Sequence, residues 1–393
     1  MTHRVLLAFF LTSLAIRLAA QQPPAARVLD LKASDGVALK ATYFAAAKPG
    51  PGVLLLHQCN RQRKVWDDLA GQLATAGINT LTLDMRGFGE SGGTAHDKLT
   101  PTETSQIREQ IWPGDIDVAF RYLVSQPGVT RDVIGVGGAS CGVNNTIQTA
   151  RRHPAEVKSV VLLSGNTDMA GRQFLRQASQ LPELFAVADD DEFPPTAQVM
   201  EWLYGVSSNP GKKSVHYATG GHGADMFQVH PELRGIIVDW YVTTLIKTPG
   251  HAPVDPNPAP SFPSAAIFNQ IEQPGGAAQV AQQLAEAREK APKAQLFPEV
   301  IVNLIGYDHL QSGETKLAVE IMKLNVSAYP ESANARDSLS DAYLADGQKD
   351  LARENAKKAI ALLDSDTADS EARRKSVRDS AEQKLKQLGE ARP

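Results

Sequence analysis

One short segment constrains the fold more than any other part of the chain. Residues 133–142 have the sequence VIGVGGASCG, an apolar run that ends in a G-x-S-x-G pattern centred on Ser140. In this pattern the serine occupies a strained turn between a buried strand and a helix, and the flanking glycines allow close backbone approach. The N-terminus of a helix beginning at Gly142 would favour negative charge beside the serine hydroxyl. The segment therefore predicts that Ser140 is a nucleophile at the carboxyl end of a strand.

The sequence around this segment predicts a sheet flanked by helices. From 27 to 246, short apolar segments bounded by turn residues alternate with segments of helical periodicity. Such alternation is typical of buried parallel strands joined by helices, so we expect an α/β sandwich with one mainly parallel sheet opened by a hairpin. The expected strands are 28–31, 37–43, 53–56, 80–83, 133–136, 157–163, 183–188 and 214–217, and the expected helices are 64–77, 113–126, 142–153 and 195–205.

A serine hydroxyl needs a base and an acid that orients the base. In the α/β-hydrolase family, which the strand–turn–helix around Ser140 resembles, the acid and the histidine follow the serine in that order after later strands. The strand-like run 183–188 is followed by three aspartates and a glutamate, and we expect Asp191 to be the acid, with Asp189 as the alternative. His222 lies in a glycine-rich loop after the last expected strand and is the expected base.

These motifs together resemble the α/β-hydrolase family, and in particular dienelactone-hydrolase-like serine hydrolases. The resemblance covers a little over half of the chain and includes the LLLH run at 54–57 and the DMRGFGES run at 84–91. It implies an α/β-hydrolase fold with a mainly parallel eight-stranded sheet flanked by helices, in a catalytic domain at 26–247. It also implies a Ser140–His222–Asp191 triad, and nothing in the sequence indicates a metal or an organic cofactor.

The chain departs from the family in the groups that would bind the oxyanion. Family members commonly have His-Gly in the loop after the third strand, whereas His57 is followed here by Gln58 and Cys59. The expected oxyanion donors are the backbone N–H of Cys141 and that of Gln58 or Cys59. Dienelactone hydrolases proper have cysteine at the centre of the turn, where this chain has Ser140. Cys59 and Cys141 are either a disulfide or two free thiols that line the pocket.

The space available for a cap over the site is small. Only residues 166–182 separate the end of one expected strand from the strand that carries the acid, which is enough for a turn and one helix. We therefore expect an open cleft. Its expected substrate-binding walls include four apolar residues that alternatively belong to the core. These residues are Trp66, Met169, Phe174 and Met226.

The N-terminal segment predicts export. A basic start, an apolar run of about 12 residues and a small-residue site before Gln21 are typical of a secretory signal at 1–20, with a retained amphipathic anchor as the alternative. We expect a soluble mature protein that is periplasmic or extracellular and not held in a membrane. The formal net charge of -4 provides no basic surplus for nucleic acid or an anionic membrane.

The remaining chain predicts a second, all-α domain. A Pro-rich linker at 248–264 precedes a helical region at 265–390 in which Gly313 and Gly347 lie 34 residues apart, within two similar helix–turn–helix patterns. This period resembles tetratricopeptide repeats, and an unrelated helical bundle is the alternative. Such a tail would bind a partner protein, drive self-association or pack on its own catalytic domain.

Three functions fit these patterns. The first is hydrolysis of a small carboxylic ester or lactone through the triad and an acyl-enzyme intermediate. The second is cleavage of a peptide or amide by the same triad. The third is a binding protein that uses the repeats and retains a vestigial hydrolase domain.

Overall fold

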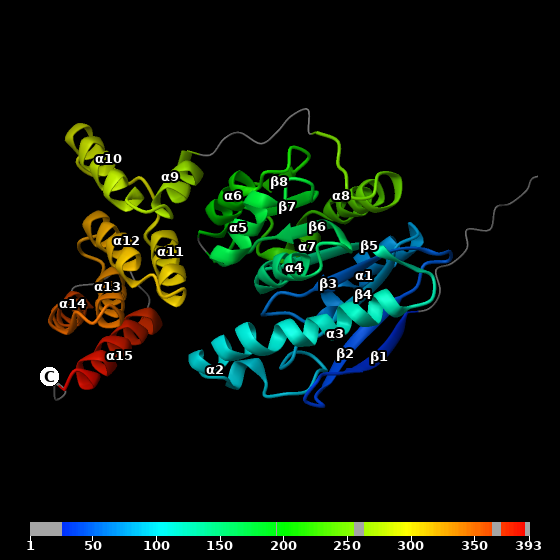
Figure 1. The fold of residues 1–393 in the computed structure, drawn as a ribbon, viewed down its shortest axis with the longest axis horizontal. Coiled ribbons are helices and arrows are strands. Elements are labelled where there is room, and N and C mark those ends of the chain that lie inside the picture. Colours follow the sequence, from blue (N-terminus) through cyan, green and yellow to red (C-terminus); the bar gives the residue numbers. More distant parts are fainter. Residues whose placement is uncertain (1–25, 194, 255–262, 364–370, 390–393) are drawn as a thin grey trace, which may run out of the picture.

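The computed structural model describes residues 26–193, 195–254, 263–363 and 371–389 (Figure 1). The predicted signal peptide at 1–20 and the middle of the predicted linker lie outside these residues. We refer to residues 26–247 as the catalytic domain and to residues 263–389 as the helical tail. Within the described residues, no helix has the length and apolar character that a membrane crossing requires.

The catalytic domain is built on one eight-stranded sheet with the order β1-β2-β4-β3-β5-β6-β7-β8. The hairpin of β1 and β2 pairs antiparallel with β4, and the remaining pairs are parallel. The predicted α/β sandwich with eight strands is therefore confirmed. The strands are β1 Arg27–Lys32, β2 Ala38–Phe44, β3 Gly50–Leu56, β4 Asn79–Leu83, β5 Val129–Ala139, β6 Val157–Leu163, β7 Glu183–Ala188 and β8 Lys213–Tyr217.

Helices cover both faces of this sheet, because successive side chains of a buried strand point to opposite sides. On β3, Val53 and Leu55 pack with helices α1 and α8, whereas Leu54 and Leu56 belong to the core under α3, α4 and α6. The principal helices of the catalytic domain are α1 Asp67–Thr75, α2 Pro101–Gln106, α3 Trp112–Ser125, α4 Cys141–Arg152, α5 Met169–Gln177, α6 Thr196–Val206, α7 Met226–Val229 and α8 Glu232–Tyr241.

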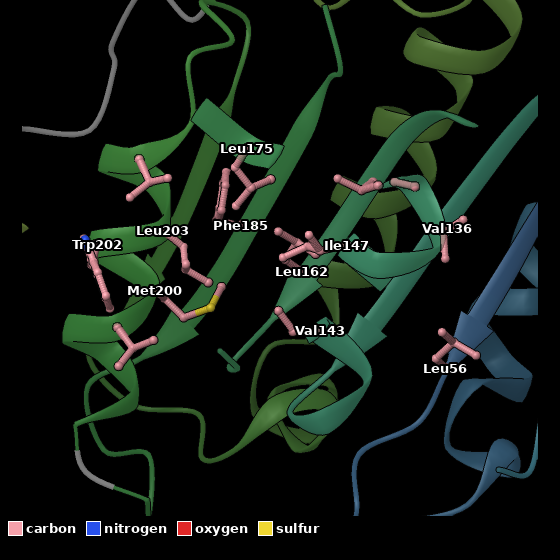
Figure 2. Packing of buried hydrophobic residues seen from close by; sticks show 14 of the residues in the cluster. Leu56, Val136, Val143, Ile147, Leu162, Leu175, Phe185, Met200, Trp202 and Leu203 are labelled. Carbon is pink, nitrogen blue, oxygen red and sulfur yellow. The ribbon is translucent and has the colours of Figure 1, made fainter. Parts of the chain in front are cut away.

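The core beneath α4 and α6 fixes where the strand ends lie. Figure 2 shows Val143 and Ile147 of α4, and Met200 and Leu203 of α6, among the side chains packed over β6 and β7. All four side chains are buried. Because α4 is anchored in this way directly after β5, the turn between them is held rigidly at the carboxyl edge of the sheet.

The helical tail contains two helix pairs that repeat at the predicted spacing. Gly313 and Gly347 both adopt a φ of 80° in the turns between paired helices, a left-handed conformation that favours glycine. The following residues repeat the same hydrogen bond, from Glu314 N–H to the His309 carbonyl and from Gln348 N–H to the Tyr343 carbonyl. The tail helices are α9 Pro263–Ile271, α10 Gly276–Lys290, α11 Glu299–Gln311, α12 Thr315–Ala328, α13 Ala333–Ala345, α14 Lys349–Leu363 and α15 Glu371–Gln387.

The tail packs on its own catalytic domain, one of the three arrangements expected for it. Figure 1 shows α9 and α11 beside α5 and α6. The ring of Trp202 on α6 lies 5.4 Å from that of Phe268 on α9, and its Nε1 donates to Asn269 Oδ1 at 3.0 Å. Phe268 and Ile321 belong to the same buried cluster as Leu54 of the sheet. The two domains therefore share one core.

Candidate active site

Ser140 occupies the strained turn that the sequence predicted. It follows β5 directly, has φ 53° and ψ −120°, and precedes α4, which begins at Cys141. Glycines flank it because neighbouring backbone leaves no room for side chains. A Cβ at Gly138 would lie 2.2 Å from the Gly142 carbonyl oxygen, and one at Gly142 would lie 2.5 Å from the Leu56 carbonyl oxygen. A non-glycine residue in such a conformation is a recognised feature of functional sites.

His222 and Asp191 form the hydrogen-bonded pair expected beside this serine. Nδ1 of His222 lies 2.8 Å and 3.0 Å from the two carboxylate oxygens of Asp191, and both side chains are buried. A carboxylate accepts hydrogen bonds, so Nδ1 is the donor and Nε2 is free to accept a proton. His222 and Ser140 line the same cavity. The chain thus holds a candidate nucleophile, base and orienting acid at one place.

The other two aspartates after β7 are exposed residues of a turn, and each also makes hydrogen bonds that hold a neighbouring segment. Asp190 Oδ1 accepts from the backbone N–H groups of Gly220 and Gly221 at 2.7 and 2.8 Å, which shapes the loop that carries the histidine. Asp189 pairs with His216 at 2.6 Å instead. This pairing disfavours Asp189, the alternative acid, and favours Asp191.

The loop after β3 is fixed by the side chain of His57. Its Nε2 accepts from the Met85 N–H at 3.0 Å, so the ring proton is on Nδ1 and donates to the Gln58 carbonyl at 2.8 Å. Burial lowers the pKa of His57 to about 4, which keeps the imidazole neutral near neutral pH. His57 is therefore a structural residue of the loop.

Gln58 has a role that the sequence did not predict. Its side chain is fully buried, its Oε1 accepts from the Ala224 N–H at 2.7 Å, and its Nε2 donates to the His222 carbonyl at 3.3 Å. The residue thereby connects the loop after β3 to the backbone of His222 and Ala224. The only sequence signal was the departure from the usual His-Gly pattern at this position.

Cys59 and Cys141 form a disulfide, which decides between the two arrangements left open for them. Their Cα atoms are 5.9 Å apart, within the range that the bond requires. Both residues line the cavity next to Ser140, whereas Gln58 does not. The N–H of Cys141 belongs to the first turn of α4, where backbone donors have no helical partner. This placement favours Cys59 over Gln58 as the residue that supplies the second oxyanion donor.

Comparison with known proteins agrees with this geometry. Residues 47–222 match the family model described as serine aminopeptidase, S33. The catalytic domain has the α/β-hydrolase fold. The matched region lies within this domain and runs from the loop before β3 to His222.

The relatives of this chain are distant. An uncharacterized 31.7 kDa protein of Escherichia coli, from the traX-finO intergenic region, is 28% identical over 136 residues. That alignment covers 34% of this chain and 44% of the relative, so the chain spans less than half of that relative's length.

Solved structures similar to this protein align with a little over half of its chain. A dienelactone hydrolase from Anabaena variabilis is 19% identical with a TM-score of 0.45, covering 57% of this chain and 99% of its own. Est1E from Butyrivibrio proteoclasticus, solved with ferulic acid, is 18% identical with a TM-score of 0.46, covering 56% and 100%. An esterase from Pyrococcus furiosus is 16% identical with a TM-score of 0.43, covering 56% and 90%.

The cavity has a volume of about 550 Å³ and a mixed lining, in which most residues carry hydrogen-bonding side chains but apolar atoms make up most of the exposed area. It is bounded by the loop after β3, the start of α4, the loop after β6, the residues around the start of α6, and one residue of the tail. Besides the catalytic groups and the disulfide, the lining includes Asn60, Arg108, Trp112, Asn144, Asn145, Ser164, Gly165, Asn166, Thr167, Asp168, Phe193, Thr196, Val199 and Asp308.

None of the four predicted wall residues lines this cavity, and that prediction was wrong. Trp66 and Met226 are buried in the core on the α1 side of the sheet. Phe174 lines a separate cavity near the end of α5, and Met169 is half-buried at the start of α5. The large side chains of Trp66 and Met226 lie in the core, and the cavity is lined by polar residues together with other apolar residues, among them Phe193 and Val199.

The cap prediction is supported, with one addition. The segment between β6 and β7 contains a single helix, α5, as its length indicated. Two further residues also line the cavity. Arg108 comes from the segment before α3, and Asp308 comes from α11. Arg108 packs over the ring of Trp112 at 5.7 Å and approaches Cys59 Sγ at 3.4 Å. Within the described residues, no cluster of histidine, cysteine and acidic side chains is placed to hold a metal ion.

Proposed function

We propose that the protein hydrolyses carboxylic esters or lactones through a Ser140–His222–Asp191 triad and an acyl-enzyme intermediate. One observation carries the proposal: Ser140 lies on a strained turn in the same cavity as His222, whose Nδ1 is held by Asp191 at 2.8 Å. An activated serine nucleophile requires a neighbouring base that is held by an orienting acid, as Asp191 holds His222.

The reaction would proceed in two steps. In the first, Ser140 Oγ attacks the ester carbonyl, its proton passes to His222 Nε2, and the N–H groups of Cys141 and Cys59 stabilise the oxyanion. The proton then moves to the leaving alkoxide as the carbon–oxygen bond breaks. In the second, a water molecule gives a proton to His222 Nε2 and attacks the acyl carbon. His222 then returns this proton to Ser140 Oγ as the acyl–Oγ bond breaks and the carboxylic acid leaves.

Labelling by a fluorophosphonate probe tests for the activated serine. We expect covalent labelling of the wild-type protein and none of Ser140→Ala or His222→Ala. Ser179→Ala and His216→Ala are matched controls outside the catalytic cavity, and we expect them to be labelled like the wild type. Absence of labelling in the folded wild type would refute the proposal and favour a binding protein with a vestigial hydrolase domain.

Amide or peptide cleavage is the second candidate, and the description of the matching family model favours it. The same triad attacks both bonds, so the geometry of the catalytic groups does not discriminate between them. A panel that contains 4-nitrophenyl esters, lactones and aminoacyl 4-nitroanilides separates the two candidates. Turnover of anilides at rates comparable with esters would support the peptidase.

Export is also part of the proposal. The secretory pattern at 1–20 supports it, and a disulfide between Cys59 and Cys141 persists more readily in an oxidising compartment. Expression of the full chain in a Gram-negative host tests it. We expect a periplasmic protein whose N-terminal sequence begins near Gln21, whereas an intact N-terminus in the cytoplasmic fraction would contradict it.

A further inference from the structure

The helical tail contributes directly to the catalytic cavity. Asp308, near the end of α11, lines the same cavity as Ser140 and His222. It is held there from the catalytic domain, because the fully buried Arg172 of α5 donates from Nη2 to Asp308 Oδ2 at 2.7 Å. Within the described residues, no group donates a hydrogen bond to the other carboxylate oxygen, Oδ1. The carboxylate is thus fixed at one oxygen and available at the other.

Two further oxygen atoms in the cavity wall also accept no hydrogen bond from the described residues. Ser164 Oγ and Asn166 Oδ1 are buried and have no hydrogen-bond partner among the described residues. Both residues follow β6 and line the cavity. Ser164 has a φ of 44°, a strained conformation for a residue other than glycine, and strain of this kind is concentrated at functional sites.

Hydrogen-bond acceptors without a partner determine which ligands a cavity binds well. A buried acceptor that stays unpaired costs about 1–3 kcal/mol, so a purely alkyl substrate that covered these oxygens would bind poorly. A substrate with hydroxyl or N–H groups would instead pair them. A site built to hydrogen-bond a substrate donor discriminates strongly against an analogue that lacks it.

We propose that the substrate is a polar ester with hydroxyl or N–H donors, and that Asp308 of the tail and Asn166 and Ser164 of the catalytic domain recognise these donors. This inference rests on the proposed ester hydrolysis and adds the substrate class. It assigns the tail a role in specificity, because one of the three recognising residues comes from α11.

Two matched substrate pairs test the proposal on the full-length protein. The acyl pair is 4-nitrophenyl butyrate and 4-nitrophenyl 3-hydroxybutyrate, and the alcohol pair is butyl acetate and erythritol monoacetate. We expect kcat/KM to favour the hydroxylated member of at least one pair by tenfold or more. Equal values, or a preference for the alkyl member in both pairs, would overturn the proposal.

Three variants then test which residues recognise the hydrogen-bond donors of the substrate. We expect Asp308→Asn, Asn166→Leu and Ser164→Ala each to reduce the measured preference by fivefold or more. Ser164→Ala removes one oxygen atom and leaves the Arg172 contacts intact, so it answers the question even if Asp308→Asn fails to fold. Asp350→Asn is a matched control on α14, where the side chain is 97% exposed, and it should keep the wild-type preference. A preference that all three variants retain would overturn the assignment.

The fluorophosphonate labelling experiment distinguishes a wrong substrate class from a wrong proposal of ester hydrolysis. If the fluorophosphonate labels Ser140 but neither substrate pair shows a preference, the substrate class is wrong and the serine hydrolase stands. If the folded wild type is not labelled, ester hydrolysis itself is refuted, and the substrate class is refuted with it.

Discussion

Cys59 and Cys141 are joined by a disulfide at the catalytic cavity, although 82 positions separate them in the chain. Cys141 follows Ser140 directly, and Cys59 lies in the loop after β3. These are the two places from which the proposed oxyanion donors would come. The bond would therefore fix the distance between these two proposed donors.

Reduction of this disulfide is expected to lower both activity and stability. Loss of one oxyanion donor typically costs about 10²–10³ in rate, and closure of a loop of this length contributes about 4 kcal/mol in the chain-entropy model. Dithiothreitol should therefore reduce kcat and lower the unfolding temperature of the wild type. The double variant Cys59→Ser, Cys141→Ser removes both cysteines of the chain, so it should have the reduced activity and not respond to dithiothreitol. Unchanged kcat after complete reduction, verified by thiol titration, would contradict this role.

The sequence predicted those parts of the site that local chemistry determines. A strand, a G-x-S-x-G turn and a helix are adjacent in the chain, so Ser140 could be placed from its neighbours alone. His222 and Asp191 could be placed because each loop follows an identifiable strand. The 34-residue spacing of Gly313 and Gly347 likewise predicted the two helix pairs.

The walls of the cavity could not be predicted in the same way, because they depend on how distant segments pack. Asp308 comes from α11, a helix of the tail that reaches the cavity because the tail packs on α5 and α6. Trp66 and Met226 were expected at the cavity for their size and apolarity, and the same properties drew them into the core. The side-chain role of Gln58 depends on a loop that lies far away in the sequence.

Replacing Gln58 is expected to affect catalysis through the position of His222. Gln58→Leu leaves the N–H of Ala224 without its buried acceptor, a loss of about 1–3 kcal/mol, and frees the loop that carries the histidine. We expect kcat to fall by about 10-fold or more with a smaller change in KM. Gln72→Leu, on the exposed face of α1, should have wild-type kinetics. A variant whose stability falls while the kcat of the folded protein is unchanged would show that Gln58 is merely structural.

Glu183 is expected to make stability depend on pH. The side chain is fully buried at the start of β7, and burial raises its pKa to about 8, against the opposing effects of the Ser207 hydroxyl and the Lys212 ammonium. The folded state therefore binds a proton that the unfolded state releases near pH 4.5. The stabilising effect is fully present below pH 4.5 and is lost as the pH rises to about 8.

The variant Glu183→Gln isolates this effect because it cannot ionise. Between pH 5 and pH 8, the wild type should lose about 3 kcal/mol of unfolding free energy relative to the variant. Denaturant unfolding at both pH values measures the difference. Glu331→Gln at an exposed position should show no comparable change with pH. Parallel pH profiles for Glu183→Gln and the wild type would mean that the raised pKa is absent.

Glu272 is expected to hold the tail on the catalytic domain. It lies just after α9 and is 97% buried at its side chain, where it accepts from Arg172 Nε at 2.6 Å and also pairs with Arg176. Breaking a buried pair by removing one charge costs about 3–5 kcal/mol, because the remaining charge stays desolvated. Glu272→Gln should therefore lower the unfolding temperature of the whole protein, measured by calorimetry. Asp379→Asn, which breaks the exposed pair with Lys375, should change the unfolding free energy by less than about 1 kcal/mol.

The number of transitions in the calorimetric trace also tests whether the tail unfolds together with the catalytic domain. Because Phe268 and Ile321 share a buried cluster with the strands of the sheet, the two domains should unfold in one cooperative transition. Glu272→Gln should shift that transition or separate the tail from it, and the separated form should lose the wall residue Asp308 from the cavity. Two independent transitions in the wild type, unaffected by Glu272→Gln, would mean that the tail is only tethered. The catalytic domain would then have to recognise its substrate without α11.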